Sequence, residues 1–380
     1  MKRETYKLKQ LCSEIVDCVN KTAPTSDAPT PYKMLRTSDI REGKINLENL
    51  NCVTKEVYEK WTRRGKLQKG DVIFTREAPL GEVGLVREEK NYFLGQRLVL
   101  FRANDKICDG RFLMYSLLWH DNKQAIISKG VGSTVAHLRV PECENIEIKA
   151  PDLDIQHRIA DILSAYDDLI ENNQKQIKLL EEAAQRLYKE WFVDLRFPGH
   201  ENTKIVDGVP EGRRRGLLKE LISVNYGKDH KKVPDDGNIP VYGSGGLMRK
   251  CNKSLFSGEA VLIPRKGSLN NIMYVDETFW TVDTMFYATM KQPHTAVFVY
   301  FFVKAFDMYS MNIGAAVPSM TTKILDAMDV VIPDKETLEK FDKYAKVYFN
   351  KIKTLQGQNE QLKTARDLLL PKLMSGEVEV

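Results

Sequence analysis

Three short motifs in the sequence hold residue types with which chemistry would be possible. Gly243-Ser244-Gly245-Gly246 could approach a phosphate, but no lysine and hydroxyl residue follow at the spacing of a nucleotide-binding loop, so we expect a tight turn. Pro151-Asp152 and Pro333-Asp334 could each begin the metal site of a nuclease, but the acidic-x-Lys triplet that completes such a site does not follow. Both aspartates are better explained as helix N-caps.

Other catalytic patterns are missing from the sequence. It contains no H-E-x-x-H, and no Pro-Pro pair from which the base-holding motif of an adenine methyltransferase could be built. The six cysteines form no C-x-x-C pair, so neither disulfides nor a zinc site is expected at Cys12, Cys18, Cys52, Cys108, Cys143 or Cys251. The sequence therefore predicts a binding protein with no catalytic residues, no metal and no cofactor.

An internal repeat indicates which elements would position the remaining polar residues. The segments 132–135 and 314–317 lie 182 positions apart, and so do Pro151 and Pro333. A short apolar stretch that is typical of a strand precedes each proline. Because no gap is needed between these matches, the chain is a tandem duplication.

The same offset continues through a heptad pattern in both copies. The predicted seam residues recur at multiples of seven, and they are Ile159, Tyr166, Leu180 and Leu187 in the first copy and Phe341, Tyr348, Leu355, Leu362 and Leu369 in the second. This spacing predicts two long helices of roughly 35–40 residues that pack in a coiled-coil seam.

A more divergent module precedes each long helix. A turn leads into a strand at 70–76 in the first module and at 258–265 in the second, and short apolar helices are expected at 112–119 and 298–306. Mixed strands with few helices predict an α+β fold.

The segment between the two copies has the composition of an exposed linker. It combines prolines and glycines with the run Arg213-Arg214-Arg215. We expect these arginines to be solvated, and the alternative is that they touch phosphate.

The composition is that of a globular protein. Charged residues make up 29% of the chain and hydrophobic residues 42%, with a formal net charge of +5. No apolar run approaches the roughly 20 residues of a membrane helix, and the first residues are polar, so we expect a cytoplasmic protein with no membrane span. The mild positive charge is compatible with a nucleic-acid partner but does not argue for one.

Several segments resemble the specificity subunits of Type I restriction–modification systems. Residues 187–192 and 197–200 resemble the end of the central conserved region of these subunits, and 368–377 resembles their closing motif. The segments 240–246 and 263–268 are similar to the opening of many of their recognition domains. The resemblance covers essentially the whole chain in the expected order.

The resemblance implies an α+β fold with two tandem target-recognition domains. Each domain would consist of mixed sheet and short helices and would be followed by a long helix, and the two long helices would form an antiparallel coiled coil. The expected boundaries are 1–150 for domain 1, 151–196 for helix 1, 197–333 for the linker with domain 2, and 334–380 for helix 2.

The resemblance also implies a function and a set of partners. The chain would be a non-catalytic subunit that recognises a bipartite double-stranded DNA site with an unspecified spacer. Its partners would be two modification (methyltransferase) subunits, which hold S-adenosylmethionine, and restriction subunits, which carry an ATP-dependent motor and nuclease. The helices would set the spacer, since a helix of about 55 Å exceeds the roughly 34–36 Å of one DNA turn.

Base recognition requires side chains that match the donors and acceptors of base edges. Arginine and lysine suit guanine, asparagine and glutamine suit adenine, and hydroxyls suit either. The candidates are Arg76, Arg97, Lys129, Ser133, Thr134 and His137 in the first module, and Tyr242, Ser244, Arg265, Lys266, Asn270, Asn271 and Thr322 in the second. For each of them a phosphate contact or a plain surface role is the alternative, and His137 could equally be packed.

Two other classes of function stay open at this point. A fused methyltransferase or nuclease with unrecognised motifs would modify or cleave DNA without a partner. A two-headed coiled-coil adaptor would bind proteins, and its loss would leave DNA methylation unchanged.

Overall fold

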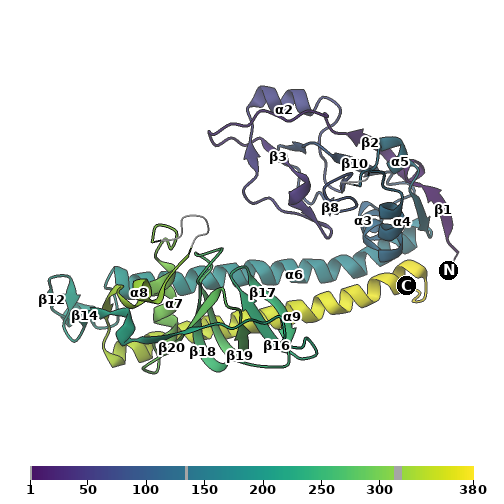
Figure 1. The fold of residues 1–380 in the computed structure, drawn as a ribbon. Coiled ribbons are helices and arrows are strands. Elements are labelled where there is room, and N and C mark those ends of the chain that lie inside the picture. Colours follow the sequence, from purple (N-terminus) through teal and green to yellow (C-terminus); the bar gives the residue numbers. More distant parts are fainter. Residues whose placement is uncertain (1, 133–135, 312–318) are drawn as a thin grey trace. The chain divides into compact units, whose positions relative to one another are not determined.

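The computed structural model describes residues 2–132, 136–311 and 319–380, and Figure 1 traces its elements. The chain forms two compact units, which comprise residues 1–172 with 358–380 and residues 173–357. The long helices α6 (Leu153–Tyr188) and α9 (Lys335–Ser375) each contribute one part to either unit. Among the described residues, no helix is long and apolar enough to cross a membrane.

The first unit is built on a four-stranded antiparallel sheet. Its strands are ordered β2 (Cys12–Asp17), β10 (Leu98–Ala103), β7 (Val72–Thr75) and β8 (Val83–Leu85). The strand period of two divides the side chains of β7 between two buried faces. Val72 and Phe74 join a core with α3 (Gly110–Leu118) and the start of α6, whereas Ile73 joins a second core with Leu35. Because both faces are buried, β7 is apolar along nearly its whole length.

Shorter elements complete the first unit. The strand β3 (Lys33–Leu35) pairs with β6 (Asn51–Cys52) and, in parallel, with β9 (Tyr92–Leu94). The other strands and α-helices are β1 (Glu4–Lys7), β4 (Ile40–Arg41), β5 (Lys44–Ile45), β11 (Glu147–Ala150), α1 (Leu8–Leu11), α2 (Lys55–Trp61), α4 (His120–Ser128) and α5 (Val140–Glu144).

The second unit is built on a six-stranded sheet. Its order is β15 (Ile222–Tyr226), β20 (Met285–Met290), β18 (Phe256–Pro264), β19 (Met273–Thr281), β16 (Ile239–Gly243) and β17 (Gly246–Cys251). Val261 and Ile263 face a core with α7 (Ala296–Lys304), and Leu262 faces the opposite core. The other strands and α-helices are β12 (Ile205–Val206), β13 (Val209–Pro210), β14 (Arg214–Leu217), β21 (Asp329–Ile332) and α8 (Thr322–Asp326). As predicted, residues 243–246 form the turn between two strands, β16 and β17.

The duplication extends further than the sequence comparison indicated. In the first unit β1 pairs with β11, with Glu4 opposite Ala150, and in the second β14 pairs with β21, with Arg214 opposite Ile332. Both pairs place the opening strand of a copy beside the strand that leads into its long helix. The offset between the opening strands is 210 rather than 182, and this shift concealed the match in the sequence.

Two arginines occupy matching positions just before these opening strands. Arg3 Nη2 donates to Leu373 O (2.6 Å) near the end of α9, and Arg213 Nη1 donates to Trp191 O (3.4 Å) just beyond α6. The Arg213 guanidinium also lies 3.9 Å from the ring centre of Phe197. The expectation of a solvated arginine run is therefore wrong for Arg213, which is only 8% exposed because it supports the end of a helix.

The two long helices run antiparallel. In the first unit Asp167 of α6 pairs with Arg366 near the end of α9, at 2.6 Å. In the second unit Trp191 packs on Phe341 near the start of α9, with ring centres 5.9 Å apart. These contacts confirm the predicted fold class, and Asp334 caps α9 as expected by accepting from the N–H of Thr337 (2.8 Å).

The predicted seam residues lie along these helices at different depths. Ile159, Phe341 and Leu355 are buried, and the half-buried positions are Tyr166, Leu180, Leu187, Tyr348, Leu362 and Leu369. Ile159 and Leu369 pack in the core of the first unit, whereas Phe341 packs in that of the second. The stripes thus serve the module cores as well as the helix pair.

Candidate nucleic-acid interface

In the first unit, Arg76 lies at the end of the central strand, where three loops meet. Its N–H donates to Arg97 O (2.8 Å), and its carbonyl accepts from Leu138 N (3.0 Å). Its side chain is only 16% exposed because Nη2 pairs with Asp17 Oδ1 (3.0 Å). These contacts bring three candidates together, since His137 directly precedes Leu138.

Arg97 is the more accessible arginine of this group. Its side chain is 50% exposed, and its Nε lies 3.4 Å from a Glu77 carboxylate oxygen. Its φ of 69° places the backbone in the left-handed region, at the turn that enters β10. Lys129 is exposed at the end of α4, and the candidates Ser133 and Thr134 lie outside the described residues.

Arg265 is the counterpart of Arg76 in the second unit. It follows β18, its N–H donates to Thr284 O (2.8 Å), and its carbonyl accepts from Met320 N (2.9 Å). Its guanidinium lies 5.5 Å from the ring centre of Tyr226, which ends β15. Tyr226 is at the sheet position that Asp17 holds in the first unit. The two modules therefore retain the same arginine and surround it differently.

Four further candidates lie in the loops around Arg265. Lys266 is exposed beside it, and Ser244 and Asn271 are half-buried and joined by a bond from Asn271 Nδ2 to Ser244 O (2.9 Å). Thr322 is half-buried at the start of α8, two residues after Met320. The loops 244–246, 265–271 and 319–322 thus form one loop surface at the end of β18.

Two candidate side chains form hydrogen bonds within the second unit. The Asn270 side chain donates to Asp307 (3.0 Å) and accepts from the N–H of Met308 (2.8 Å). The Tyr242 hydroxyl donates to Glu277 Oε1 (2.5 Å), and burial together with this bond raises the pKa of the phenol. Both side chains are better explained as structural groups than as groups that read a base.

Sequence reasoning missed a basic loop that follows Tyr226, the neighbour of Arg265. Lys228, Lys231 and Lys232 follow β15 and are exposed, and no carboxylate pairs with their side chains in the described part of the chain. Trp280 Nε1 donates to Lys228 O (3.1 Å), which fixes the start of this loop. The cluster of lysines was visible in the sequence, but the contact between Tyr226, which precedes it, and Arg265 depends on the strand order of the sheet.

The first unit holds a further arginine that the sequence did not single out. Arg64 Nη1 donates to Cys18 O (2.8 Å) and lies 3.5 Å from Asp17, so that Asp17 sits between Arg64 and Arg76. No pattern in the sequence relates these residues.

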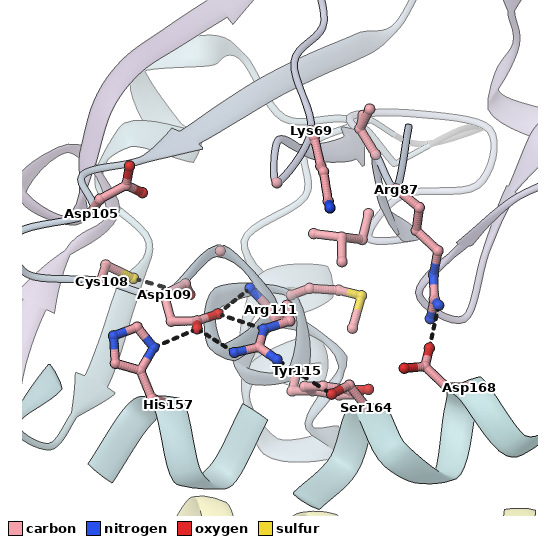
Figure 2. A pocket seen from close by; sticks show the side chains of 15 residues that line it. Lys69, Arg87, Asp105, Cys108, Asp109, Arg111, Tyr115, His157, Ser164 and Asp168 are labelled. Carbon is pink, nitrogen blue, oxygen red and sulfur yellow. Dashed lines mark hydrogen bonds and ion pairs between the residues drawn. The ribbon is translucent and has the colours of Figure 1, made fainter. Parts of the chain in front are cut away.

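A cavity of about 620 Å³ in the first unit lies between the sheet loops and α6 (Figure 2). Most of its charged side chains are paired: Asp109 contacts Arg111 and His157, and Arg87 contacts Asp168. No cluster of histidine, cysteine and acidic residues suited to a metal ion occurs among the residues that the structure describes. We therefore assign the cavity to the contact between module and helix.

Comparisons with known proteins agree with this arrangement. The family model for the Type I restriction modification DNA specificity domain matches residues 3–182 and 217–364. The MjaIX specificity subunit of Methanocaldococcus jannaschii is 25% identical, over 82% of this chain and 78% of that protein. The HindI specificity subunit of Haemophilus influenzae is 22% identical, over 90% and 94%. The crystal structure of a Type I system S subunit from M. genitalium has a similar fold, with a TM-score of 0.62, 18% identity, and coverage of 98% and 96%.

Proposed function

Because the chain belongs to the family of Type I restriction–modification specificity subunits, which recognise DNA sequence and are not catalytic, we propose that it reads a bipartite site. Each module reads one half, and the chain directs modification and restriction subunits to the DNA. The observation that carries the proposal is the pair of matching arginines, Arg76 and Arg265, at the same place in both sheets.

The surroundings of these arginines support two different half-sites. Asp17 holds Arg76 away from solvent, while Arg97 is half-exposed. In the second unit, Tyr226 lies beside Arg265 and Lys266 is exposed next to it. Because base recognition depends on which donors reach the groove, two modules with one framework and different exposed donors would prefer different sequences.

The long helices support a gapped site. The 36 residues of α6 correspond to about 54 Å of helix, longer than the roughly 34–36 Å of one DNA turn. We propose that helix length fixes the spacer, and that two modification subunits bind this chain, joined by restriction subunits.

The proposal is tested by comparing the adenine methylome of the native host with that of a strain that lacks this gene. We expect one asymmetric two-part motif to lose its methylation on deletion. Unchanged methylation while the partner genes are intact and expressed would refute DNA reading and favour a protein adaptor. Methylation of DNA by the purified chain alone would favour an enzyme.

Arg97→Asn and Arg265→Ala are expected to weaken recognition of different half-sites. Asparagine tolerates the left-handed backbone at position 97. Loss of a guanidinium that reads a base costs about 1–3 kcal/mol, or roughly 5- to 150-fold in affinity. Affinities of the chain with its modification partner should be measured on the parent site and on sites altered in one half. If both variants lost affinity equally on every DNA, a role in base readout would be contradicted.

Changing Lys228, Lys231 and Lys232 together to glutamine is expected to weaken binding to all DNA sequences alike. The slope of log affinity against log salt should become shallower by about one for each phosphate that the variant no longer neutralises. Titrations at several salt concentrations give this slope. Lys55→Gln is the control, since Lys55 is exposed on α2 and pairs with Glu59. A loss of affinity confined to one DNA sequence would indicate base recognition instead.

A further inference from the structure

Each long helix has a surface that contacts its module, and corresponding positions on these two surfaces carry different charges. Positions 182 residues apart correspond in α6 and α9. The acidic residues Asp161, Asp168 and Glu171 of α6 thereby correspond to Lys343, Asn350 and Lys353 of α9. Each module must meet the surface that its own helix presents.

The first module meets its acidic helix with arginines (Figure 2). Arg87, which follows β8, lies 2.5 Å from Asp168 and 3.2 Å from Glu171. Arg111 of α3 lies 2.7 Å from Asp161. In these contacts the cations are on the module and the anions on the helix, whereas the Asp109–His157 contact places a carboxylate on the module.

The second module presents the opposite charges. Lys346 of α9 lies 3.0 Å from Glu259 of β18, and Lys353 Nζ donates to the carbonyl of Asp276 (2.8 Å). By strand register, the position that matches Arg87 is Asp276 of β19. In these two contacts the lysines are on the helix, and a carboxylate and a carbonyl are on the module. Asp342 of α9 places one carboxylate on the helix, where it contacts His294 of the module at 2.7 Å.

A buried contact between module and helix also differs between the two units. Asp167 of α6 is 6% exposed and accepts from the Tyr115 hydroxyl of α3 (2.5 Å). The matching residues of the second unit are Phe349 and Phe301, whose ring centres lie 6.0 Å apart. A carboxylate that needs a hydroxyl donor in one unit is replaced by an apolar contact in the other.

We infer that each module is matched to the first part of its own long helix, and that the portable recognition unit ends near residue 172 in the first copy and 354 in the second. The boundary therefore does not fall at the prolines before the helices. The second module on α6 would set Phe301 against Asp167 and leave a buried carboxylate without its donor. It would also place Glu259 near the acidic surface of α6. This inference does not depend on DNA reading.

Two chimeras test the boundary. In the module-only chimera, residues 213–332 replace 3–150; in the module-plus-helix chimera, 213–354 replace 3–172. The module-plus-helix chimera also carries Arg366→Ala, because Phe349 then stands at position 167 and Ala184 is the counterpart of Arg366. The module-only chimera keeps both Asp167 and Arg366. The chimeras thus differ in the region 151–172 and at its partner position 366. Thermal unfolding without DNA should give a midpoint about 10 °C lower for the module-only chimera. Equal midpoints would overturn the inference.

If neither chimera folds, the match between module and helix is tested by exchanging charges at Arg87 and Glu171 in the parent chain. Arg87→Glu should lower the unfolding midpoint by several degrees, and adding Glu171→Lys should restore part of this loss. Lys55→Glu with Glu59→Lys on α2 is the matched control and should change little. If Glu171→Lys restores nothing, the surfaces are not matched by charge. Because no DNA is present, a failure of DNA recognition would leave these results unaffected.

Discussion

Replacing Arg366 with methionine is expected to lower the free energy of unfolding by about 3 kcal/mol. Arg366 Nη1 lies 2.6 Å from Asp167, and both side chains are largely shielded from water. Methionine keeps the apolar stem but removes the charge, so a buried carboxylate is left with the hydroxyl of Tyr115 as its remaining partner in these contacts. Urea unfolding of the full chain, followed by circular dichroism, measures the loss of stability.

Two comparisons isolate the buried charge as the cause. Arg139→Met removes an arginine that is 73% exposed and pairs with Glu142, and it should cost less than about 1 kcal/mol. Asp167→Asn added to the Arg366→Met chain should recover part of the stability, because the unpaired charge is then gone. An Arg366→Met chain as stable as the Arg139→Met chain would contradict the prediction.

Asp109→Ala is expected to destabilise the first unit by about 3 kcal/mol, through the loss of a helix cap and of a buried polar network. The Asp109 carboxylate accepts from the N–H groups of Arg111 (2.7 Å) and Phe112 (3.2 Å) at the start of α3. It also contacts His157 Nδ1 of α6 at 2.7 Å, so it joins the module to its helix (Figure 2). Asp105→Ala is the control, since Asp105 lines the same cavity and is exposed.

The effect of Asp109→Ala should depend on pH. Burial raises the pKa of Asp109, but hydrogen bonds from Arg111 and His157 outweigh it and hold the pKa below its ordinary value. The carboxylate therefore contributes its stability above the unfolded pKa of about 3.9, and this contribution is lost as pH falls through the lower folded pKa. The difference in unfolding free energy between parent and variant should be present at about pH 5 and shrink below about pH 4. A difference that does not change with pH would show that packing alone is responsible.

Elements with a strong local pattern could be predicted from the sequence. The heptads gave α6 and α9, and the apolar runs gave β7 and β18. The strand pair β1–β11 was missed because it joins residues 140 or more positions apart, and no local period marks such a pairing. Arg213 was misassigned for a related reason, since its partners lie in residues 191–197 and are brought to it by the fold.

The sequence predicted candidate interface residues by their type, but it did not predict which of them are exposed. Arg76 and Arg265 were identified, yet only the sheet order reveals that Asp17 covers one and Tyr226 lies beside the other. Asn270 and Tyr242 have side chains suited to base recognition, and the fold uses both internally. The sequence shows which side chains could bind a base. Whether such a side chain is exposed or bonded within the fold depends on residues that are distant in the sequence.

The first unit consists of two separate segments of the chain, and this has a consequence for how the protein folds during synthesis. Its core joins Leu8 and Phe112 to Leu373 and Met374, so it needs the segment 358–380. A ribosome makes that segment after residues 1–357, whereas the second unit lies within 173–357 and is synthesised without interruption. Domains generally fold in the order of their synthesis, but here the module made first must wait for chain made after the second. A chain that stops early would release a finished second module beside an incomplete first one.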